Sequence, residues 1–249
     1  MATETEKSDE PTHSLIEFPK ESKTAQLYPH IILQVLDTSY VTHDVKRFVL
    51  EKPPDYTFIP GQSVNVSINL PEWKSELRPF TFTNLPDDDY LEFMIKIYRE
   101  HKDVTQKLES INKGDELILH DIFGTIKYEE PGVFISAGSG ITPFLSIFRY
   151  LYKQHRAKEN MLIYSNKASE DVIMEESLHT MLKDHFITIF TREHVVGFIE
   201  KRIDRNFLID HIRDFKQHFY ICGPENFVTD LRKLLLSLGA TVDNIIFVY

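Results

Sequence analysis

A glycine-rich turn near the middle of the chain is the first feature that could do chemistry. Residues 132–143 read Gly-Val-Phe-Ile-Ser-Ala-Gly-Ser-Gly-Ile-Thr-Pro. The apolar run 133–137 is typical of a buried strand, and a proline favours the first helical turn, where its missing N–H is not needed. Glycines between a strand and a helix N-terminus leave backbone N–H groups free for phosphate, although an ordinary tight turn could have the same pattern. The candidate anion-binding residues are Gly138, Ser139, Gly140, Ile141, Thr142 and Pro143.

A second segment, Arg-Pro-Phe-Thr-Phe-Thr-Asn at 78–84, combines a cation, aromatic rings and hydroxyl groups. In a regular strand, side chains alternate between two faces. Arg78, Phe80 and Phe82 would then share one face, and Thr81 would lie on the other. Phe80 and Thr81 can therefore face one site only if the strand ends or bulges there. An ordinary barrel strand would also account for this segment.

The elements that must position these residues differ between the two halves of the chain. The front half predicts short strands separated by Pro-, Gly- and Asp-containing turns, and one short helix between Asp103 and Gly114. Six strands at this spacing favour an antiparallel β-barrel. The predicted strands are 31–36, 46–50, 63–70, 79–83, 90–98 and 116–120.

Beyond residue 129 strands alternate with helices, which predicts a doubly wound, five-stranded parallel α/β sheet. Ligands of such sheets bind beyond the carboxyl ends of the strands, so residues 138–142, 165–167, 191–192 and 222–224 should lie along one edge. We expect a disordered acidic tail at 1–28, the barrel domain at 29–128 and the α/β domain at 129–249. The predicted strands are 133–137, 161–165, 186–190, 219–222 and 245–248, and the predicted helices 143–155, about 172–183, about 200–212 and 225–238.

Composition excludes several function classes. The formal net charge of −10 argues against a general nucleic-acid surface. No apolar stretch is long enough to span a bilayer, and the N-terminus lacks the plan of a signal peptide. The single cysteine, Cys222, excludes a disulfide and a cysteine-ligated iron–sulfur cluster within these residues. These features together predict a cytoplasmic protein. The histidines lack metal-ligand spacing, so we expect no metal site.

Four motifs, taken in order, resemble those of the ferredoxin–NADP⁺ reductase family, and the resemblance extends over about residues 30–249. Residues 58–62, Phe-Ile-Pro-Gly-Gln, are similar to its F-x-P-G-Q turn, and residues 78–84 resemble its flavin motif Arg-x-Tyr-Ser-x-x-Ser. Residues 138–143 resemble its pyridine-nucleotide turn, and Cys-Gly-Pro at 222–224 its nicotinamide-side turn. Each motif is weak alone, but the ordered set is specific.

The resemblance implies roles for residues of the front half. Arg78 would pair with the FAD pyrophosphate, Phe80 would pack against the isoalloxazine in place of the usual tyrosine, and Thr81 would lie near flavin N5 in place of serine. The family usually has glycine where this chain has Asp103, and a carboxylate beside a pyrophosphate is unfavourable unless it caps the helix. The other implied FAD contacts are Pro79, Lys96, Ile97, Tyr98, Val104 and Thr105.

In the back half the resemblance implies that Cys222, with Gly223 and Pro224, contacts the nicotinamide. We interpret Cys222 as a steric and polar neighbour of the hydride donor, since a nucleophilic cysteine needs a lowered pKa and a base. Tyr249 matches the terminal aromatic that covers the flavin in plant-type members. A last strand could also simply end in tyrosine. Phe247 replaces the glutamate of those members, so no proton relay through that carboxylate operates here.

The choice of nucleotide depends on charge after the second and third strands of the α/β half. Lys167, next to Asn166, and Arg192 are placed to bind a 2′-phosphate, and residues 191–193 resemble the family's Ser-Arg-Glu. We therefore predict NADP(H), with NAD(H) possible. Both cations could instead be ordinary surface residues.

The resemblance thus implies an FAD-dependent NAD(P)H oxidoreductase with Thr81, Cys222 and Tyr249 at the reacting rings. It would pass electrons singly to ferredoxin, flavodoxin or another one-electron acceptor protein, such as a haem or oxygenase component. Two alternatives remain open because several motif positions are substituted. One is a non-catalytic flavin-binding electron-transfer or assembly subunit, and the other is a nucleotide-binding regulator with an empty barrel.

Overall fold

The structure, a computed structural model, describes residues 30–124, 126–193, 199–200 and 202–248. The acidic tail predicted at 1–28 and the terminal aromatic Tyr249 lie outside the described residues. In the described part of the chain, no helix is long and apolar enough to cross a membrane.

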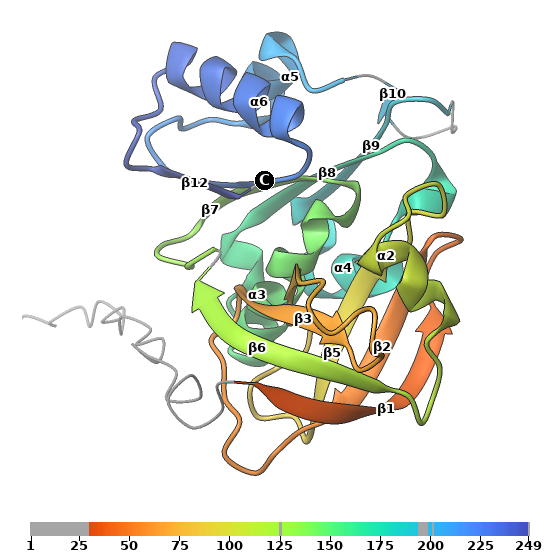
Figure 1. The fold of residues 1–249 in the computed structure, drawn as a ribbon. Coiled ribbons are helices and arrows are strands. Elements are labelled where there is room, and N and C mark those ends of the chain that lie inside the picture. Colours follow the sequence, from red (N-terminus) through yellow and green to blue (C-terminus); the bar gives the residue numbers. More distant parts are fainter. Residues whose placement is uncertain (1–29, 125, 194–198, 201, 249) are drawn as a thin grey trace, which may run out of the picture.

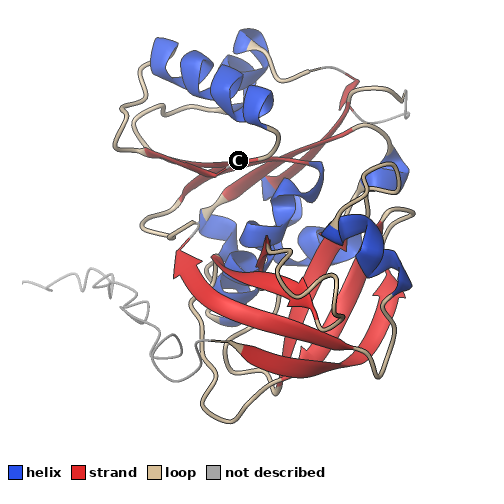
Figure 2. Cartoon of the chain, in the orientation of Figure 1, coloured by secondary structure: helices blue, strands red, loops and turns tan. Residues whose placement is uncertain are grey.

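The front half is a curled antiparallel sheet with strand order β4-β3-β6-β1-β2-β5 (Figure 2). β1 bulges between Val35 and Asp37, and the β3–β6 pair shifts register between Val64 and Val66. Bulges bend strands, which helps the sheet curl around its core. The six predicted strands are confirmed as β1 Ile31–Tyr40, β2 Val45–Glu51, β3 Gln62–Ile68, β4 Arg78–Thr81, β5 Tyr90–Lys96 and β6 Glu116–Gly124.

The two end strands of this sheet order are joined just beyond β4. The Thr83 backbone N–H donates to the Glu92 carbonyl at 3.0 Å, and the Asn84 side chain accepts from the Glu92 N–H at 2.9 Å. These bonds bring the two ends of the curled sheet together, which gives a half-barrel in the place of the predicted barrel. The short helix falls where it was expected, as α2 Val104–Lys107 followed by the 3₁₀ turn Leu108–Ser110.

The back half is a parallel sheet with strand order β10-β9-β8-β7-β11-β12. The strand order reverses between β7 and β11, which makes this pair the switch point where ligands of such sheets bind. The five predicted strands are confirmed, and the two-residue β10 extends them at one edge. The bounds are β7 Gly132–Ala137, β8 Met161–Asn166, β9 Phe186–Phe190, β10 Ile199–Glu200, β11 His218–Cys222 and β12 Ile245–Val248.

Two layers of helices cover this sheet (Figure 1). α3 Thr142–Lys153 and α4 Glu175–Leu182 lie between the sheet and the barrel, and α5 Arg205–His211 and α6 Glu225–Ser237 cover the other face. The helix predicted from about 200 begins later, because the Asp204 carboxylate caps α5 by accepting from the Phe207 N–H at 2.7 Å. The helix predicted from about 172 begins at Glu175, after the 3₁₀ turn Ser169–Asp171.

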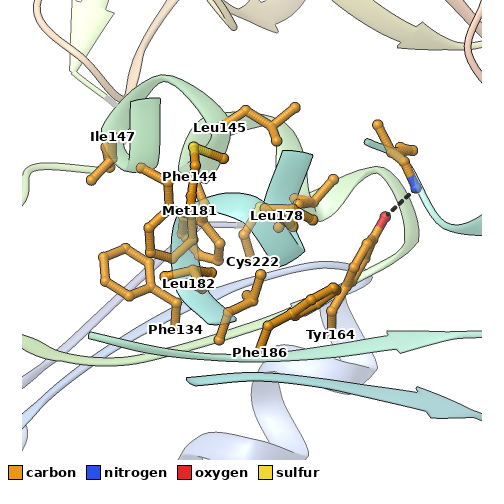
Figure 3. Close-up of a cluster of buried hydrophobic side chains, with 14 of the residues drawn as sticks. Phe134, Phe144, Leu145, Ile147, Tyr164, Leu178, Met181, Leu182, Phe186 and Cys222 are labelled. Atoms are coloured by element: carbon orange, nitrogen blue, oxygen red, sulfur yellow. Dashed lines mark hydrogen bonds between the residues drawn. The ribbon is translucent and has the colours of Figure 1, made fainter. Parts of the chain in front are cut away.

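Alternate residues of the buried strands supply two cores. Figure 3 shows the core under α3 and α4, where Phe134, Tyr164 and Phe186 from the sheet meet apolar side chains of both helices. The opposite core, under α5 and α6, takes neighbouring strand positions such as Ile135 and Ile163. Val45 and Met94 from the barrel join the first core, so apolar packing crosses between the halves.

Polar contacts also fix the halves to each other. The Arg149 Nη1 on α3 donates at 2.6 Å to the Thr83 carbonyl and at 2.6 Å to Oε1 of Glu92, whose side chain is 2 % exposed. The linker at 129–130 is held by Tyr220, whose hydroxyl contacts the Glu129 N–H at 2.9 Å and the N–H and carbonyl of Glu130 at 3.1 and 2.8 Å.

Candidate functional site

A cleft of about 720 Å³ lies between the two halves, at the carboxyl ends of β7, β8 and β11. Its volume falls within the range of ~300–1,000 Å³ that is usual for ligand sites. Both halves line it, including the glycine turn, the end of β4 and the turn after β11. The predicted residues that line it are Pro79, Phe80, Thr81, Lys96, Tyr98, Thr105, Gly138, Ser139, Gly140, Thr142, Pro143, Asn166, Lys167, Cys222, Gly223 and Pro224.

The glycine turn forms the back wall of the cleft. Residues 138–141 make one 3₁₀ turn that leads into α3, and Pro143 occupies the first helical turn as predicted. Gly138 has φ +52°, and the space where its side chain would be is open, so a ligand can approach the backbone. A Cβ on Gly140 would lie 2.4 Å from the Cys222 carbonyl oxygen. Glycine at this position therefore lets the two predicted nucleotide turns touch.

The end of β4 explains how Phe80 and Thr81 can face the same site although neighbouring strand residues point to opposite faces. Regular pairing stops at Thr81, and both Phe80 and Thr81 line the cleft while Phe82 turns into the barrel core. The Thr81 hydroxyl shares a hydrogen bond of 3.0 Å with the Ser63 hydroxyl on β3. A ring and an oriented hydroxyl thus face the cleft from the same edge.

Arg78 and Asp103 lie together beside the cleft. The Asp103 carboxylate caps α2, accepting from the N–H groups of Thr105 at 3.0 Å and Gln106 at 3.3 Å, and its other oxygen lies 4.0 Å from Arg78 Nη2. Partial burial would raise the pKa of Asp103, but these hydrogen bonds, one from the Thr105 hydroxyl and the charge of Arg78 outweigh it and lower the pKa. Asp103 is therefore an anion placed next to the expected phosphate contacts.

Cys222 ends β11 where the turn meets the glycine turn. Its side chain is 6 % exposed and packs with the aromatic and aliphatic core in Figure 3. Burial raises the pKa of the thiol to about 12. The sulfur is consequently a neutral thiol at pH 7 and not a nucleophile, which agrees with a contact role.

The ends of β8 and β9 supply a polar edge to the cleft. The Asn166 residue is 4 % exposed and lines the cleft beside the Tyr164 hydroxyl. Lys167 follows it into the cleft, and the Arg192 N–H donates to the Lys167 carbonyl at 2.9 Å.

Some predicted residues do not line the cleft. The side chains of Ile97, Val104 and Ile141 are buried in the hydrophobic cores, so only their backbones could serve a cofactor. Arg78 and Arg192 stand beside the lining without belonging to it.

Sequence reasoning missed several lining residues that other strands contribute. Thr81 of β4 pairs with Ser63 of β3, which pairs in turn with Phe123 of β6, so three strands place neighbouring side chains at the cleft. No local motif marks Ser63 or Phe123, because only the register between strands brings them there. Ser165 and Thr191 also line the cleft, at the sheet edge where the sequence predicted them. The remaining missed residues are Val45, Met94, Ile95, Ala137, Asp171, Ile173 and Val248.

One cluster of a histidine and two aspartates tests the expectation that the protein has no metal site. The described residues contain one cluster of three side chains whose ligand atoms lie close enough to hold a metal ion. It consists of His43, Asp44 and Asp171. The Lys96 ammonium lies 2.5 Å from Asp44 Oδ2 and already neutralises that carboxylate. The group is thus an ion-pair cluster that joins the barrel to the α/β half.

The barrel, the α/β sheet and the cleft that both halves line agree with two family models of oxidoreductase domains. A family model described as "Oxidoreductase FAD-binding domain" matches residues 33–128, and one described as "Oxidoreductase NAD-binding domain" matches residues 134–233. The chain belongs to the oxidoreductases related to ferredoxin–NADP⁺ reductase, with an FAD-binding domain followed by an NAD(P)-binding domain.

Curated relatives agree with this assignment. The chain is 25 % identical to a flavohemoprotein of Bacillus subtilis over 81 % of its own length and 54 % of the relative, so it spans about half of that protein. It is 26 % identical to NADH-cytochrome b5 reductase 1 of Eremothecium gossypii, over 82 % of the chain and 78 % of the relative.

Solved structures share the fold. The FAD/NAD-binding domain of a nitric oxide dioxygenase from Vibrio cholerae superposes with a TM-score of 0.77 at 22 % identity, covering 87 % of this chain and 97 % of that one. A ferredoxin NADP⁺ reductase from Neisseria gonorrhoeae with bound FAD and NADP has a TM-score of 0.77 at 20 % identity, covering 88 % and 98 %.

Proposed function

We propose that this FAD-dependent oxidoreductase takes hydride from NADPH and passes single electrons to a separate acceptor protein, ferredoxin or flavodoxin. One observation carries the proposal. The Phe80–Thr81 edge of the barrel and the Cys222 turn of the α/β half line the same cleft. Two rings held by different halves could meet there at the near-attack separation of about 3–3.5 Å.

The residues of the cleft would position the rings rather than donate protons. FAD supplies the conversion between a two-electron donor and one-electron carriers. Phe80 would pack against the isoalloxazine, and the Thr81 hydroxyl, oriented by Ser63, would lie near its N5. The buried thiol of Cys222 would border the nicotinamide and limit how it tilts. These roles follow from the family resemblance and from the shared cleft.

The choice of NADPH is supported by two cations at the ends of β8 and β9. The Arg192 N–H bonds to the Lys167 carbonyl, which holds the two residues side by side. Neither cation has an ion-pair partner within the described residues, so both are available to a 2′-phosphate. Glu193 instead accepts from the Ser169 N–H at 2.6 Å and hydroxyl at 2.9 Å, which anchors the loop that carries Lys167.

A separate acceptor is supported by the single cysteine, because these residues cannot hold a cysteine-ligated cluster. The names of the relatives include a flavohemoprotein, NADH-cytochrome b5 reductases and the ferredoxin–NAD(P)⁺ reductase component of a naphthalene dioxygenase system from Pseudomonas putida. A haem-containing partner is therefore the second candidate acceptor. Docking would be of the small, electrostatic kind typical of redox encounters.

Anaerobic stopped-flow spectroscopy tests the proposal. The FAD-loaded protein should bleach faster with NADPH than with NADH at equal subsaturating concentrations. It should then reduce ferredoxin or flavodoxin faster than cytochrome b5. Faster bleaching by NADH would overturn the nucleotide choice, and exclusive reduction of a haem protein would overturn the acceptor. Bound flavin that neither nucleotide bleaches would instead identify the non-catalytic electron-transfer subunit.

A further inference from the structure

One buried hydroxyl joins two segments that line the cleft. Tyr164 of β8 is 0 % exposed, and its ring lies in the core under α3 and α4 (Figure 3). Its hydroxyl donates to the Gly138 carbonyl at 2.9 Å and accepts from the Ile173 N–H at 3.4 Å. Gly138 belongs to the glycine turn and Ile173 to the loop before α4, and both line the cleft. Tyr164 lies behind this lining, so its hydroxyl can act on a ligand only through these two segments.

The bond to Gly138 fixes the orientation of one peptide group of the turn. The peptide bonds of the described residues are trans, and in a trans peptide the carbonyl and the following N–H point in opposite directions. Because the Gly138 carbonyl is held toward the core, the Ser139 N–H points away from Tyr164. Gly138 has φ +52° and open space where a Cβ would lie. A glycine leaves its backbone free to rotate, so the hydroxyl supplies the restraint that this residue lacks.

The peptide held in this way lies at the start of the helix that faces the cleft. Residues 138–141 lead into α3, whose N-cap Ile141 makes no side-chain cap hydrogen bond. The first N–H groups of such a turn lack partners within the helix and attract anions. Ser139 lines the cleft, and it falls within the residues that match the NAD-binding domain model. The anionic part of a pyridine nucleotide is its phosphate bridge.

We propose that the Tyr164 hydroxyl is a positioning group for the diphosphate of the pyridine nucleotide. It holds the 138–139 peptide so that the Ser139 N–H is presented to the cleft before the ligand arrives. The proposal rests on the proposed function only in that a pyridine nucleotide binds here. It is independent of the choice between NADPH and NADH and of the acceptor.

The test compares the FAD-loaded protein with its Tyr164→Phe variant, which loses the hydroxyl and keeps the ring. Isothermal titration calorimetry gives the Kd for NADP⁺, for NAD⁺ and for ADP-ribose, which has the diphosphate without the nicotinamide. All three Kd values should rise by the same factor of about five to ten, as expected for the loss of about one hydrogen bond. The value of kcat at saturating NADPH or NADH should stay within about twofold, because the contacts of the reacting rings are unchanged.

A matched control separates this role from a merely structural one. Tyr220 is equally buried in the same sheet, and its hydroxyl contacts the backbone of Glu129 and Glu130 in the linker. Tyr220→Phe should lower the melting temperature as Tyr164→Phe does, and should leave the three Kd values unchanged.

A second variant removes the donor itself. Ser139→Pro deletes the N–H that the turn presents, and proline is tolerated in a first helical turn. The three Kd values should rise by about as much as in Tyr164→Phe. The double variant should show no further loss, because both changes remove the same contact.

Several results would overturn the proposal once circular dichroism shows that the variants are folded. They are unchanged Kd values in Tyr164→Phe, a rise for NADP⁺ and NAD⁺ but not for ADP-ribose, an equal rise in Tyr220→Phe, and additive losses in the double variant. If Tyr164→Phe does not fold, unchanged Kd values in Ser139→Pro overturn it. A wild-type preference for NAD⁺ would correct the proposed nucleotide and leave the ratios between variant and wild type intact.

Discussion

The two halves of the molecule treat helix N-termini in opposite ways. In the α/β half, α3 and α6 begin at the cleft behind residues without polar side chains, and the turn before α3 is opened by Gly138. In the barrel half, α2 begins behind Asp103, which satisfies the first N–H groups internally. An uncapped terminus is a ready anion site, whereas a capped one is already satisfied. The two long helices that begin at the cleft therefore start without a side-chain cap, whereas the short helix α2 starts with one.

The largest effect is expected at the contact between the glycine turn and the turn after β11. Gly140→Ala places a Cβ about 2.4 Å from the Cys222 carbonyl, so the two turns must move apart. Displacements of about 1 Å can cost on the order of 100-fold in rate, and we expect that loss in kcat/KM for NADPH. Steady-state kinetics with a one-electron dye measures it. Gly124→Ala, with no neighbour within 4 Å of its Cβ, is the matched control and should retain wild-type kinetics.

The next largest effect is expected at the contact of Arg149 with Thr83 and Glu92, which joins the α/β half to the barrel. Burial would raise the pKa of Glu92, but Arg149, Arg47 and Thr83 outweigh it and lower the pKa. A lowered carboxylate pKa stabilises the fold above the unfolded value near 4.3 and loses that contribution as the pH falls through the folded value.

Removal of the Arg149–Glu92 ion pair should therefore lower the free energy of unfolding at neutral pH. Arg149→Met leaves the Glu92 carboxylate with Arg47 and the Thr83 hydroxyl, so we expect a loss of about 2 kcal/mol in the free energy of unfolding at pH 7. Urea titrations at several pH values measure it. The difference from wild type should shrink as the pH falls from the unfolded value through the lowered pKa of Glu92 in the folded wild type, where the carboxylate becomes protonated. A difference that is the same at every pH would contradict the charge-based explanation.

A smaller effect is expected at Arg192, after β9, where we propose that the 2′-phosphate of NADPH binds. Arg192→Ala should raise the KM for NADPH about tenfold, because one charge-assisted contact to the 2′-phosphate is lost. The KM for NADH should stay close to the wild-type value. Arg213→Ala removes an exposed cation beyond α5 and serves as the control. Equal increases for both nucleotides would remove Arg192 from phosphate recognition.

The smallest effect is expected at the thiol. Burial raises the pKa of the Cys222 thiol to about 12, so the thiol is neutral at pH 7. Cys222→Ala should therefore act only through packing and change kcat by less than about threefold. Iodoacetamide should label the native protein far more slowly than the urea-unfolded protein. Rapid labelling at pH 7, or loss of turnover in the alanine variant, would show that the sulfur is chemically engaged.

Much of the fold could be predicted because each half has a regular pattern. Strand after strand with short turns indicated the barrel, and the alternation after residue 129 indicated the parallel sheet. Asn166 and Lys167 could be placed at the ligand edge because parallel strands end on one side. The two-residue β10 was beyond prediction, since so short a pairing depends on its neighbour β9 and not on its own residues.

The site was predictable only where a motif marked it. The glycine turn and the 222–224 turn were recognised locally, whereas Ser63 and Phe123 reach the cleft through strand register. The side-chain alternation of 78–84 could not decide whether Phe80 and Thr81 face one site, because the end of β4 is set by tertiary pairing. Asp103 had two readings from sequence, and the hydrogen bonds from Thr105 and Gln106 identify it as the cap.

The hydrogen bonds of Tyr220 restrain the linker between the two halves. With its hydroxyl bound to backbone atoms of Glu129 and Glu130, the connection between the halves cannot act as a swivel, because hinges need backbone dihedrals that are free to change. Any change in the angle between the two halves at residues 129–130 would first have to break these three hydrogen bonds.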